Sequence, residues 1–201
     1  MRRLTVAVAI LMTLGLAACG KTQFEALPDD MSMGSKDAKI TVVEYASVGC
    51  PVCARWQKEV YPAFKAKYVD TGKVRYVFRE MLVGGDAEVT VASAGFLLAR
   101  CAGKDKYFQV NDAVYAAQPG VFYAPRDTLL EIAKSAGLNE AQFDKCVQDE
   151  AQIKALNDRV QRNSKEHDVN NTPTFEINGR KMEPGYHSLE EIDAAIANAG
   201  N

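Results

Sequence analysis

The spacing of apolar residues changes along the chain from a strand-like to a helix-like pattern and back. The run ITVVEYA over residues 40–46 is β-branched and apolar with one acid inside it, which predicts a buried strand. Pro51 fits the first turn of a following helix, where a missing N–H costs nothing, and Pro62 should kink that helix. The apolar face of the helix repeats at three- and four-residue steps through Cys53, Trp56, Val60, Phe64 and Tyr68. The run GKVRYVF over residues 72–78 predicts a second strand, so this region has the pattern of a parallel βαβ unit.

A long helical region interrupts the strand pattern from about Gly84. Segments with helical periodicity are expected at residues 86–102, 105–117, 125–136 and 139 to about 166. Strand signals return in TPTFEING, where Asn178 and Gly179 suit a tight hairpin turn. A last helix should begin at Ser188, because Glu191 three residues later predicts a capping box.

The first 18 residues have the layout of a secretory signal. Arg2 and Arg3 precede an uncharged apolar stretch over residues 4–18, which is short for a bilayer span. The stretch ends in LAAC, which resembles a bacterial lipobox, so we expect cleavage before Cys19 and acylation of that cysteine. Ordinary signal cleavage, with Cys19 present by chance, is the alternative. The mature chain is therefore expected on the periplasmic side of a bacterial cell envelope, held by its lipid to the outer or the inner membrane.

Composition after the signal limits the fold and the partners. Residues 19–36 are polar and rich in small side chains without periodicity, so they are expected to form a tether. The rest of the chain suits one domain, or one domain that carries an insertion. Without Arg2 and Arg3 of the signal, 22 of the 24 Lys and Arg residues remain against 26 Asp and Glu residues and form no basic stripe, so no nucleic-acid partner is expected.

Cys50 and Cys53 form a C-x-x-C motif at the point where the first strand gives way to the helix. Two cysteines three positions apart in a first helical turn project from the same face, so their sulfurs can meet in a disulfide. Free backbone N–H groups and the positive end of the helix dipole stabilise a thiolate at Cys50, which should be the nucleophile. Cys53, one turn further in on the apolar face, should be the shielded resolving thiol. An export compartment is oxidising, which favours such redox chemistry.

The C-x-x-C motif could instead belong to a metal site or form a structural disulfide, and the other cysteines bear on both interpretations. A zinc or copper site would need two more ligands, but Cys101 and Cys146 are 45 positions apart and His167 and His187 stand alone, so no metal is expected. A purely structural disulfide within one helical turn would close a tiny loop and constrain little. With Cys19 set aside for lipid, the four remaining cysteines allow three pairings. Cys101 and Cys146 lie in amphipathic helical stretches away from any helix start, and a bridge between them would be structural, tying two helices together.

Three motifs together resemble the DsbA family of thiol–disulfide oxidoreductases: EYASVGCPVC, TGKVRYVFRE and NNTPTFEINGR. The resemblance runs from about residue 37 to 198. It implies an α/β, thioredoxin-like fold with an inserted α-helical domain, in which residues 37–84 and 167–201 form the thioredoxin-like part and residues 85–166 the insert. Family members with a second cysteine pair in the insert are similar to the arrangement of Cys101 and Cys146.

The resemblance also implies roles for residues outside the motif. Pro173 is expected to follow a cis peptide bond and to present the backbone of Thr172 to an extended substrate. Thr172 also offers a hydroxyl near the nucleophile. Glu44 should lie beneath the resolving thiol and help move its proton. An ion pair between Glu44 and Lys73 or Arg75 is an equal alternative, since ion pairs and proton relays both perturb carboxylates.

The expected activity is oxidation of substrate protein thiols through a Cys50–Cys53 disulfide, with no cofactor. The partners implied are proteins or peptides with cysteines and a membrane redox partner that restores the disulfide. The family's best-known pattern has a histidine at the position of Val52, and an apolar valine offers no hydrogen bond to a thiolate, so a weaker oxidant is expected. A reductase or isomerase kept reduced by a membrane partner is the alternative, followed by a lipid-anchored metal chaperone or adaptor.

Overall fold

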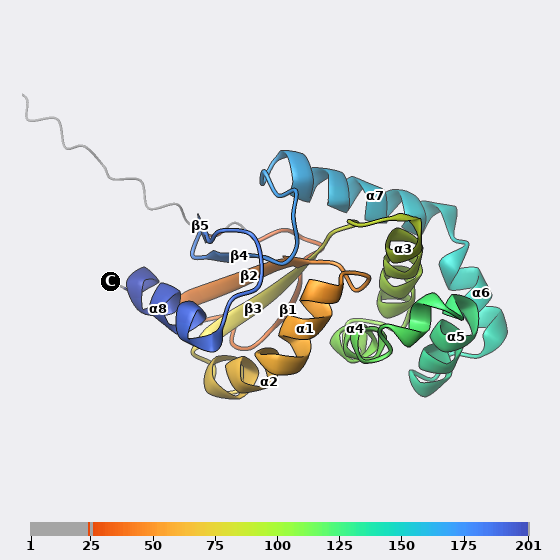
Figure 1. Ribbon diagram of the computed structural model, residues 1–201, viewed down its shortest axis with the longest axis horizontal. Helices are drawn as coiled ribbons and strands as arrows, with labels where there is room; N and C mark the ends of the chain where they lie inside the picture. Colours follow the sequence, from red (N-terminus) through yellow and green to blue (C-terminus); the bar gives the residue numbers. More distant parts are fainter. Residues whose placement is uncertain (1–23, 25, 201) are drawn as a thin grey trace, which may run out of the picture.

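A five-stranded mixed sheet forms the centre of the protein (Figure 1). The computed structural model describes residues 24 and 26–200. The strand order is β1-β3-β2-β4-β5, with β2 and β3 parallel and the other neighbours antiparallel. The strands are β1 (Met31–Met33), β2 (Ile40–Ala46), β3 (Val74–Glu80), β4 (Thr174–Ile177) and β5 (Arg180–Lys181).

Two sets of helices surround this sheet. The set that flanks the sheet consists of α1 (Pro51–Glu59), α2 (Tyr61–Phe64), the π-helical turn η1 (Lys65–Val69) and α8 (Leu189–Ala199). The set inserted between β3 and β4 consists of α3 (Asp86–Cys101), α4 (Tyr107–Ala116), the 3-10 turn η2 (Gly120–Phe122), α5 (Pro125–Ser135), α6 (Glu140–Val147) and α7 (Glu150–Lys165). In Figure 1 the helices α3 to α6 gather at one end of the molecule, and α7 leads back toward β4. The expected α/β fold with inserted helices is confirmed.

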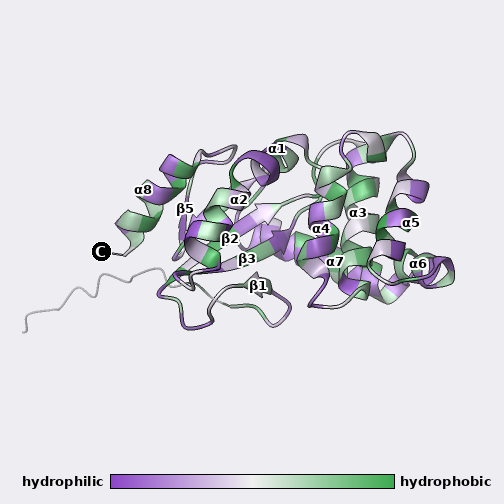
Figure 2. Cartoon of the chain, turned by 90° about the horizontal axis from the view of Figure 1, so that it is seen from below, coloured by the Kyte–Doolittle hydropathy of each residue, from purple (hydrophilic) through white to green (hydrophobic). Residues whose placement is uncertain are grey.

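Apolar burial joins both sets of helices to the sheet. Trp56 on α1 is fully buried, and its ring centroid lies 4.7 Å from that of Phe175 on β4. This contact fixes α1 against β4, the strand that follows Thr172 and Pro173. In the insert, α3 is largely apolar along its length (Figure 2), and its buried side chains include Val91, Phe96 and Leu98. The helices of the insert therefore pack around α3.

Two expected helices are each divided. The helix after the first strand ends at Glu59 and restarts as α2 at Tyr61, because Pro62 has no N–H to continue the hydrogen-bond ladder. The stretch from residue 139 to about 166 is two helices, α6 and α7. The side chain of Asp149 accepts a hydrogen bond from the backbone N–H of Gln152, which caps a new helix there.

Other local predictions are confirmed. Asn178 and Gly179 have φ values of 48° and 81° and form the turn between β4 and β5, a conformation that these two residue types tolerate best. The Ser188 side chain accepts from the N–H of Glu191, whose carboxylate accepts from the N–H of Ser188 in return. This is the expected capping box.

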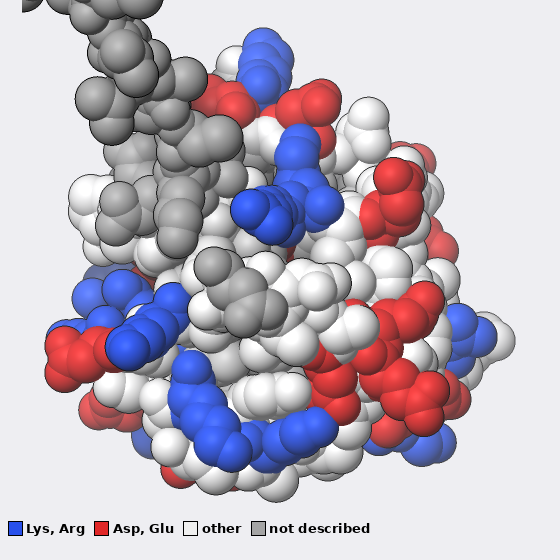
Figure 3. Space-filling model, turned by 90° about the vertical axis from the view of Figure 1, so that its left-hand side faces the viewer, with Lys and Arg blue, Asp and Glu red and all other residues white. Residues whose placement is uncertain are grey.

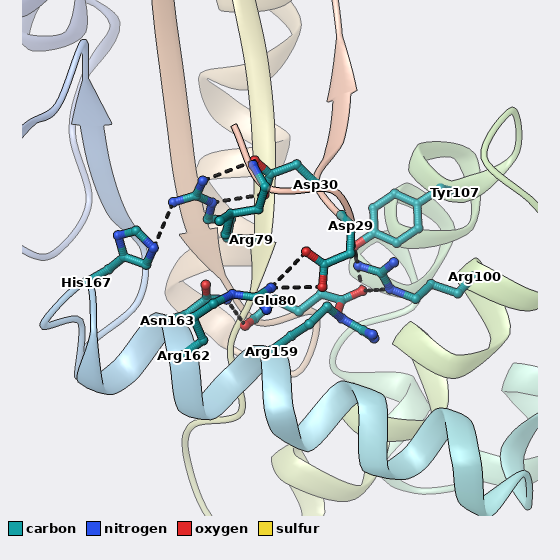
Figure 4. A network of polar contacts seen from close by, with 11 residues as sticks. Asp29, Asp30, Arg79, Glu80, Arg100, Tyr107, Arg159, Arg162, Asn163 and His167 are labelled. Atoms are coloured by element: carbon teal, nitrogen blue, oxygen red, sulfur yellow. Dashed lines mark hydrogen bonds and ion pairs between the residues drawn. The ribbon is translucent and has the colours of Figure 1, made fainter. Parts of the chain in front are cut away.

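The prediction of a tether over residues 19–36 does not hold for the last part of that segment. Met31–Met33 pairs antiparallel with β3 as the strand β1. Two ion pairs hold the residues before this strand (Figure 4). Asp30 binds Arg79 through two contacts of 3.0 Å, and both side chains are almost fully buried. Asp29 binds Arg162 on α7 at 2.8 Å. Backbone pairing and these charges order a stretch that lacks apolar periodicity. Residues 19–23 and 25 lie outside the described part of the chain.

A buried carboxylate, Glu80, joins the sheet to the insert at the end of β3 (Figure 4). Arg100 on α3 and Arg159 on α7 reach its two oxygens at 2.6 and 2.5 Å, and the Tyr107 hydroxyl donates to it at 3.0 Å. The side chain of Asn163 donates to the backbone oxygen of Glu80. Three elements of the insert are therefore fixed to one strand end by charge-assisted hydrogen bonds.

Charges of both signs lie side by side on the end of the molecule that carries α8 (Figure 3). Lys67 and Asp193 form one such pair at 2.6 Å, and Lys181 lies 3.7 Å from Asp168. Exposed pairs of this kind contribute little to stability. The visible part of this face therefore carries charges of both signs.

Candidate active site

Cys50 stands at the N-cap of α1, at the carboxyl end of β2. Its backbone is extended, Pro51 occupies the first turn, and no acidic residue lies in that turn. The Cys50 Sγ accepts a hydrogen bond from the backbone N–H of Cys53 at 3.4 Å. The sulfur therefore takes the place that a Ser or Asp side chain occupies in ordinary helix caps, where a negative charge is stabilised.

The two thiols of the motif have opposite electrostatic environments. A hydrogen bond from the Cys53 side chain, with further help from Thr172 and backbone N–H groups, lowers the pKa of Cys50 to about 6 against the opposing effect of burial. Burial raises the pKa of Cys53 well above its usual value, and the neighbouring Cys50 and Glu44 raise it further. The exposed fraction of Cys50 is 7%, and Cys53 is fully buried. One sulfur is thus a reachable thiolate and the other a shielded thiol.

The loop before β4 lies against Cys50. The Thr172–Pro173 peptide bond is cis, and the Cys50 sulfur lies 3.6 Å from the backbone oxygen of Thr172, to which it donates when it is protonated. The loop is fixed on both sides, since the Thr174 hydroxyl donates to the backbone oxygen of Asn171 at 2.8 Å and the Gly185 N–H donates to that of Pro173 at 2.8 Å. The nucleophile and the backbone of Thr172 therefore lie beside each other.

Glu44 lies inside the sheet and is 1% exposed. Its Oε2 accepts a hydrogen bond from the hydroxyl of Tyr76 on β3 instead of pairing with Lys73 or Arg75. Burial raises the pKa of this carboxyl to about 8, although the Tyr76 hydrogen bond opposes that shift and the charge on Cys50 adds to it. Glu44 is therefore a protonated acid at neutral pH, electrostatically coupled to both sulfurs.

A groove of about 810 Å³ opens beside the motif, between the outer face of α1 and the insert. Pro51 lines it on the α1 side, and Tyr115 on α4, Pro119, and Phe122 of η2 line it on the side of the insert. The Gln118 side chain binds this loop to the active-site segment, because its Nε2 donates to the backbone oxygen of Val48 at 2.6 Å. The insert thus takes part in the surface around the nucleophile.

Tyr76, Tyr115 and Gln118 were not predicted to be site residues. Tyr76 and Tyr115 fit their strand and helix patterns as ordinary core positions, and Gln118 lies in the turn after α4. Each reaches the site only through contacts between distant segments. The one available signal was local: Tyr76 lies in the TGKVRYVFRE motif beside the strand of Glu44.

The other two cysteines of the described residues form a pair of their own. Cys101, at the end of α3, and Cys146, in α6, are joined by a disulfide with a Cα–Cα distance of 6.0 Å. Within residues 24 and 26–200, no three His, Cys, Asp or Glu side chains come together in a way that could hold a metal ion. Cys19, the predicted lipidation site, lies outside the described residues.

Comparison with known proteins agrees with this geometry. Residues 26–198 match a family model described as Thioredoxin. A Rickettsia bellii (strain RML369-C) protein named as a protein-disulfide oxidoreductase is 33% identical over 183 residues, which cover 89% of this chain and 68% of that protein. The crystal structure of alpha-DsbA1 from Wolbachia pipientis has a TM-score of 0.76 and 27% identity, and the match covers 87% of this chain and 93% of that one. Oxidised BdbD from Bacillus subtilis, at 19% identity and a TM-score of 0.73 over 85% and 92% of the two chains, shares the fold.

The fold and the paired thiols define a thioredoxin-like protein that carries out thiol–disulfide exchange. The chain belongs to the thioredoxin family and, within it, to the DsbA-like thiol–disulfide oxidoreductases. It spans 63% of the length of the Rickettsia conorii relative and 68% of the Rickettsia bellii one. Among the described residues, no helix has the length and apolar character needed to span a bilayer.

Proposed function

We propose that this protein oxidises the thiols of other proteins through a disulfide between Cys50 and Cys53. A substrate thiolate attacks the Cys50 sulfur, the Cys50–Cys53 bond breaks, and Cys53 leaves with the electron pair. A second substrate thiolate then attacks the substrate sulfur of the mixed disulfide and releases Cys50 as a thiolate. The substrate leaves with a disulfide, and two electrons remain on the two cysteines.

The place of the Cys50 sulfur at the N-cap of α1, where it accepts the Cys53 N–H and its pKa is lowered, is the observation that carries this proposal. A thiol with a pKa of about 6 is mostly ionised at neutral pH, so it is a good leaving group in the second step and the reduced form is favoured. Comparable thiols have pKa values of about 7 in thioredoxin and about 3.5 in the strongest oxidants of this class. A value between these limits supports an oxidant of intermediate strength, as expected from Val52.

Substrate recognition in this proposal uses the surface around Cys50. An extended segment of the substrate pairs with the backbone of Thr172, ahead of Pro173, in the manner of an added strand. Glu44 supplies a proton to the Cys53 thiolate when the internal disulfide breaks. The disulfide between Cys101 and Cys146 takes no part in exchange and stabilises the insert.

The protein acts in the bacterial cell envelope, where disulfides persist, and a membrane redox partner reoxidises it. Cys19 carries the lipid that holds it to a membrane. The proposal can be tested by labelling with a lipid precursor, which should mark the wild type and leave Cys19→Ala unlabelled. Release of the unlabelled variant into the soluble envelope fraction is expected.

A reductase or isomerase function is favoured by one observation, the exposed apolar side chain of Val52 beside the nucleophile. The two directions differ in the resting state of Cys50 and Cys53 in cells. Acid trapping followed by alkylation should find the pair mostly oxidised if the protein is an oxidase. Mostly reduced cysteines would establish the reductase or isomerase instead.

The assigned roles of the two thiols can be tested with single substitutions. Cys53→Ser should accumulate mixed disulfides with substrates, because the nucleophile remains and cannot be resolved, whereas Cys50→Ser should trap none. Mixed disulfides on the Cys50→Ser variant alone would reverse the roles. Retained insulin reduction by metal-free protein would exclude the metal chaperone or adaptor.

A further inference from the structure

The two residues before the nucleophile, Val48 and Gly49, pack closely against the insert. Val48 is fully buried, and a Cβ at Gly95 on α3 would lie 3.1 Å from its side chain. A Cβ at Gly49 would lie 2.2 Å from the backbone oxygen of Glu88, in the first turn of α3, so only a glycine fits there. The segment that leads from β2 to Cys50 is therefore in close contact with α3.

One polar contact adds to this packing. The Nε2 of Gln118, in the turn after α4, donates to the backbone oxygen of Val48 at 2.6 Å, although the two residues are 70 positions apart. Gln118 is itself held by the end of α4, since its backbone N–H donates to the backbone oxygen of Tyr115 at 3.1 Å. The contact therefore joins α4 to the backbone two residues before Cys50.

The turn that ends at Cys50 depends on the same backbone. The Cys50 N–H donates to the backbone oxygen of Ser47 at 3.0 Å, and the Gly49 N–H donates to the Ser47 hydroxyl oxygen at 3.3 Å. The peptide group between Val48 and Gly49 thus carries both this N–H and the oxygen that Gln118 binds. A single side chain of the insert therefore fixes the orientation of a peptide within the turn.

The Cys50 thiolate is sensitive to how that turn is held. Its pKa is lowered first by a hydrogen bond from the Cys53 side chain, and further by Thr172 and by the backbone N–H groups of Cys53 and Val52. The Sγ of Cys50 lies 3.4 Å from the Cys53 nitrogen and 3.6 Å from the Thr172 oxygen. Hydrogen bonds weaken steeply as their lengths and angles depart from the optimum, so a shifted sulfur would lose part of this support.

We propose that Gln118 is a positioning residue that fixes the peptide between Val48 and Gly49 and so keeps Cys50 at the N-cap of α1. The inference rests on the proposed function, in which Cys50 is the nucleophile, and it gives the insert a part in setting the strength of the oxidant. Gln118 acts through the backbone and not on the sulfur itself. Loss of its hydrogen bond lets the peptide rotate, weakens the contacts to the Cys50 thiolate and makes the reduced form less stable.

Gln118→Met tests this because it removes the donor and keeps a side chain of similar length. Alkylation of Cys50 in the reduced protein is followed against pH, and the protein is equilibrated with a glutathione buffer at pH 7. The midpoint of alkylation should rise by about half a pH unit, as expected when part of one hydrogen bond is transmitted to the thiolate. The equilibrium constant for reduction by glutathione should fall about threefold, which is about 14 mV for a two-electron couple.

Gln57→Met is the matched control. The Gln57 side chain on α1 donates through the same kind of amide nitrogen to Asp112 on α4 at 2.7 Å, so this variant also loses one hydrogen bond between α4 and the thioredoxin-like part. That bond does not involve the peptide between Val48 and Gly49, and both measured values should stay at those of the wild type. The emission of Trp56, buried on α1, should be unchanged in both reduced variants if the site remains folded.

Gln118→Ala is a second variant, since it leaves no long side chain to repack against Val48, and it should shift both values in the same direction. Wild-type values in the folded Gln118 variants would overturn the inference. Equal shifts in Gln57→Met would also overturn it, because general loosening of the insert would then be the cause. Alkylation of wild-type Cys50 with the midpoint of an ordinary thiol would instead contradict the proposed nucleophile.

Discussion

The Tyr76 hydroxyl on β3 donates a hydrogen bond to the Glu44 carboxyl on the neighbouring strand β2, and both side chains are buried. A carboxyl in such a place resists ionisation, because burial penalises its charged form. Its pKa is accordingly raised to about 8. The pair thus keeps a proton inside the sheet at neutral pH.

This raised pKa should make the stability of the reduced protein depend on pH. The folded state binds the Glu44 proton more tightly than the unfolded state, so the stabilisation is complete below pH 4.5 and is lost as the pH rises to about 8. Glu44→Gln cannot ionise and should lose less stability over that range. The difference should be on the order of a few kcal/mol, measured by urea unfolding at pH 5 and pH 8.

Cys50 needs a separate control in this experiment. Its lowered pKa has the opposite effect, because a thiolate favoured in the folded state adds stability above about pH 6. Both proteins should therefore carry Cys50→Ser. If the two then lose stability in parallel from pH 5 to pH 8, Glu44 is not a protonated buried acid.

Arg159 should be important for the attachment of the insert to the sheet. Arg159→Met leaves Glu80 buried with one fewer positive partner, and the free energy of unfolding should fall by about 2–4 kcal/mol. Arg126→Met is the control, since its pairs with Glu140 and Asp144 are exposed and screened by water, so their loss should change the free energy of unfolding much less. Equal losses in the two variants, measured by urea unfolding, would show that burial does not strengthen the Glu80 contact.

The sequence was most informative where one local segment determines the conformation. The strand before Cys50, the proline after it and the apolar face of α1 together place the nucleophile at a helix start. Asn178 and Gly179 specify their turn because few other residues accept positive φ.

Features that depend on distant segments were not predictable in this way. Asp29 and Arg162 meet across 133 positions, and nothing near either residue indicates the other. The strand β1 is only three residues long, so its pairing partner and not its own pattern makes it a strand.

The disulfide between Cys101 and Cys146 should stabilise the fold and leave the redox chemistry alone. Closing a loop of 45 residues reduces the entropy of the unfolded chain and so raises its free energy by about 4 kcal/mol. Replacing both cysteines with Ala should lower the free energy of unfolding by a few kcal/mol, with little change in the potential of Cys50 and Cys53. Loss of exchange activity at a temperature where the variant is still folded would identify a second redox centre.

Val52 should limit the oxidising strength of the protein. Its side chain is 40% exposed beside Cys50 and provides neither charge nor a hydrogen bond. In Val52→His an imidazole would stabilise the Cys50 thiolate, so the Cys50 pKa should fall below its present value of about 6. The reduced form gains stability as a result, and the potential should rise by about 30 mV for each 1.4 kcal/mol.

Two measurements check this prediction, the pH profile of Cys50 alkylation and the equilibrium with a glutathione buffer. Val52→His should also be reduced faster by a model dithiol, because a more acidic Cys50 is the better leaving group. Thr172→Val provides the opposite change, since the Thr172 side chain helps lower the Cys50 pKa and its loss should raise that pKa. If Val52→His leaves both the pKa and the potential unchanged while Thr172→Val shifts them, the helix terminus and Thr172 set the thiolate stability, and Val52 has no part in it.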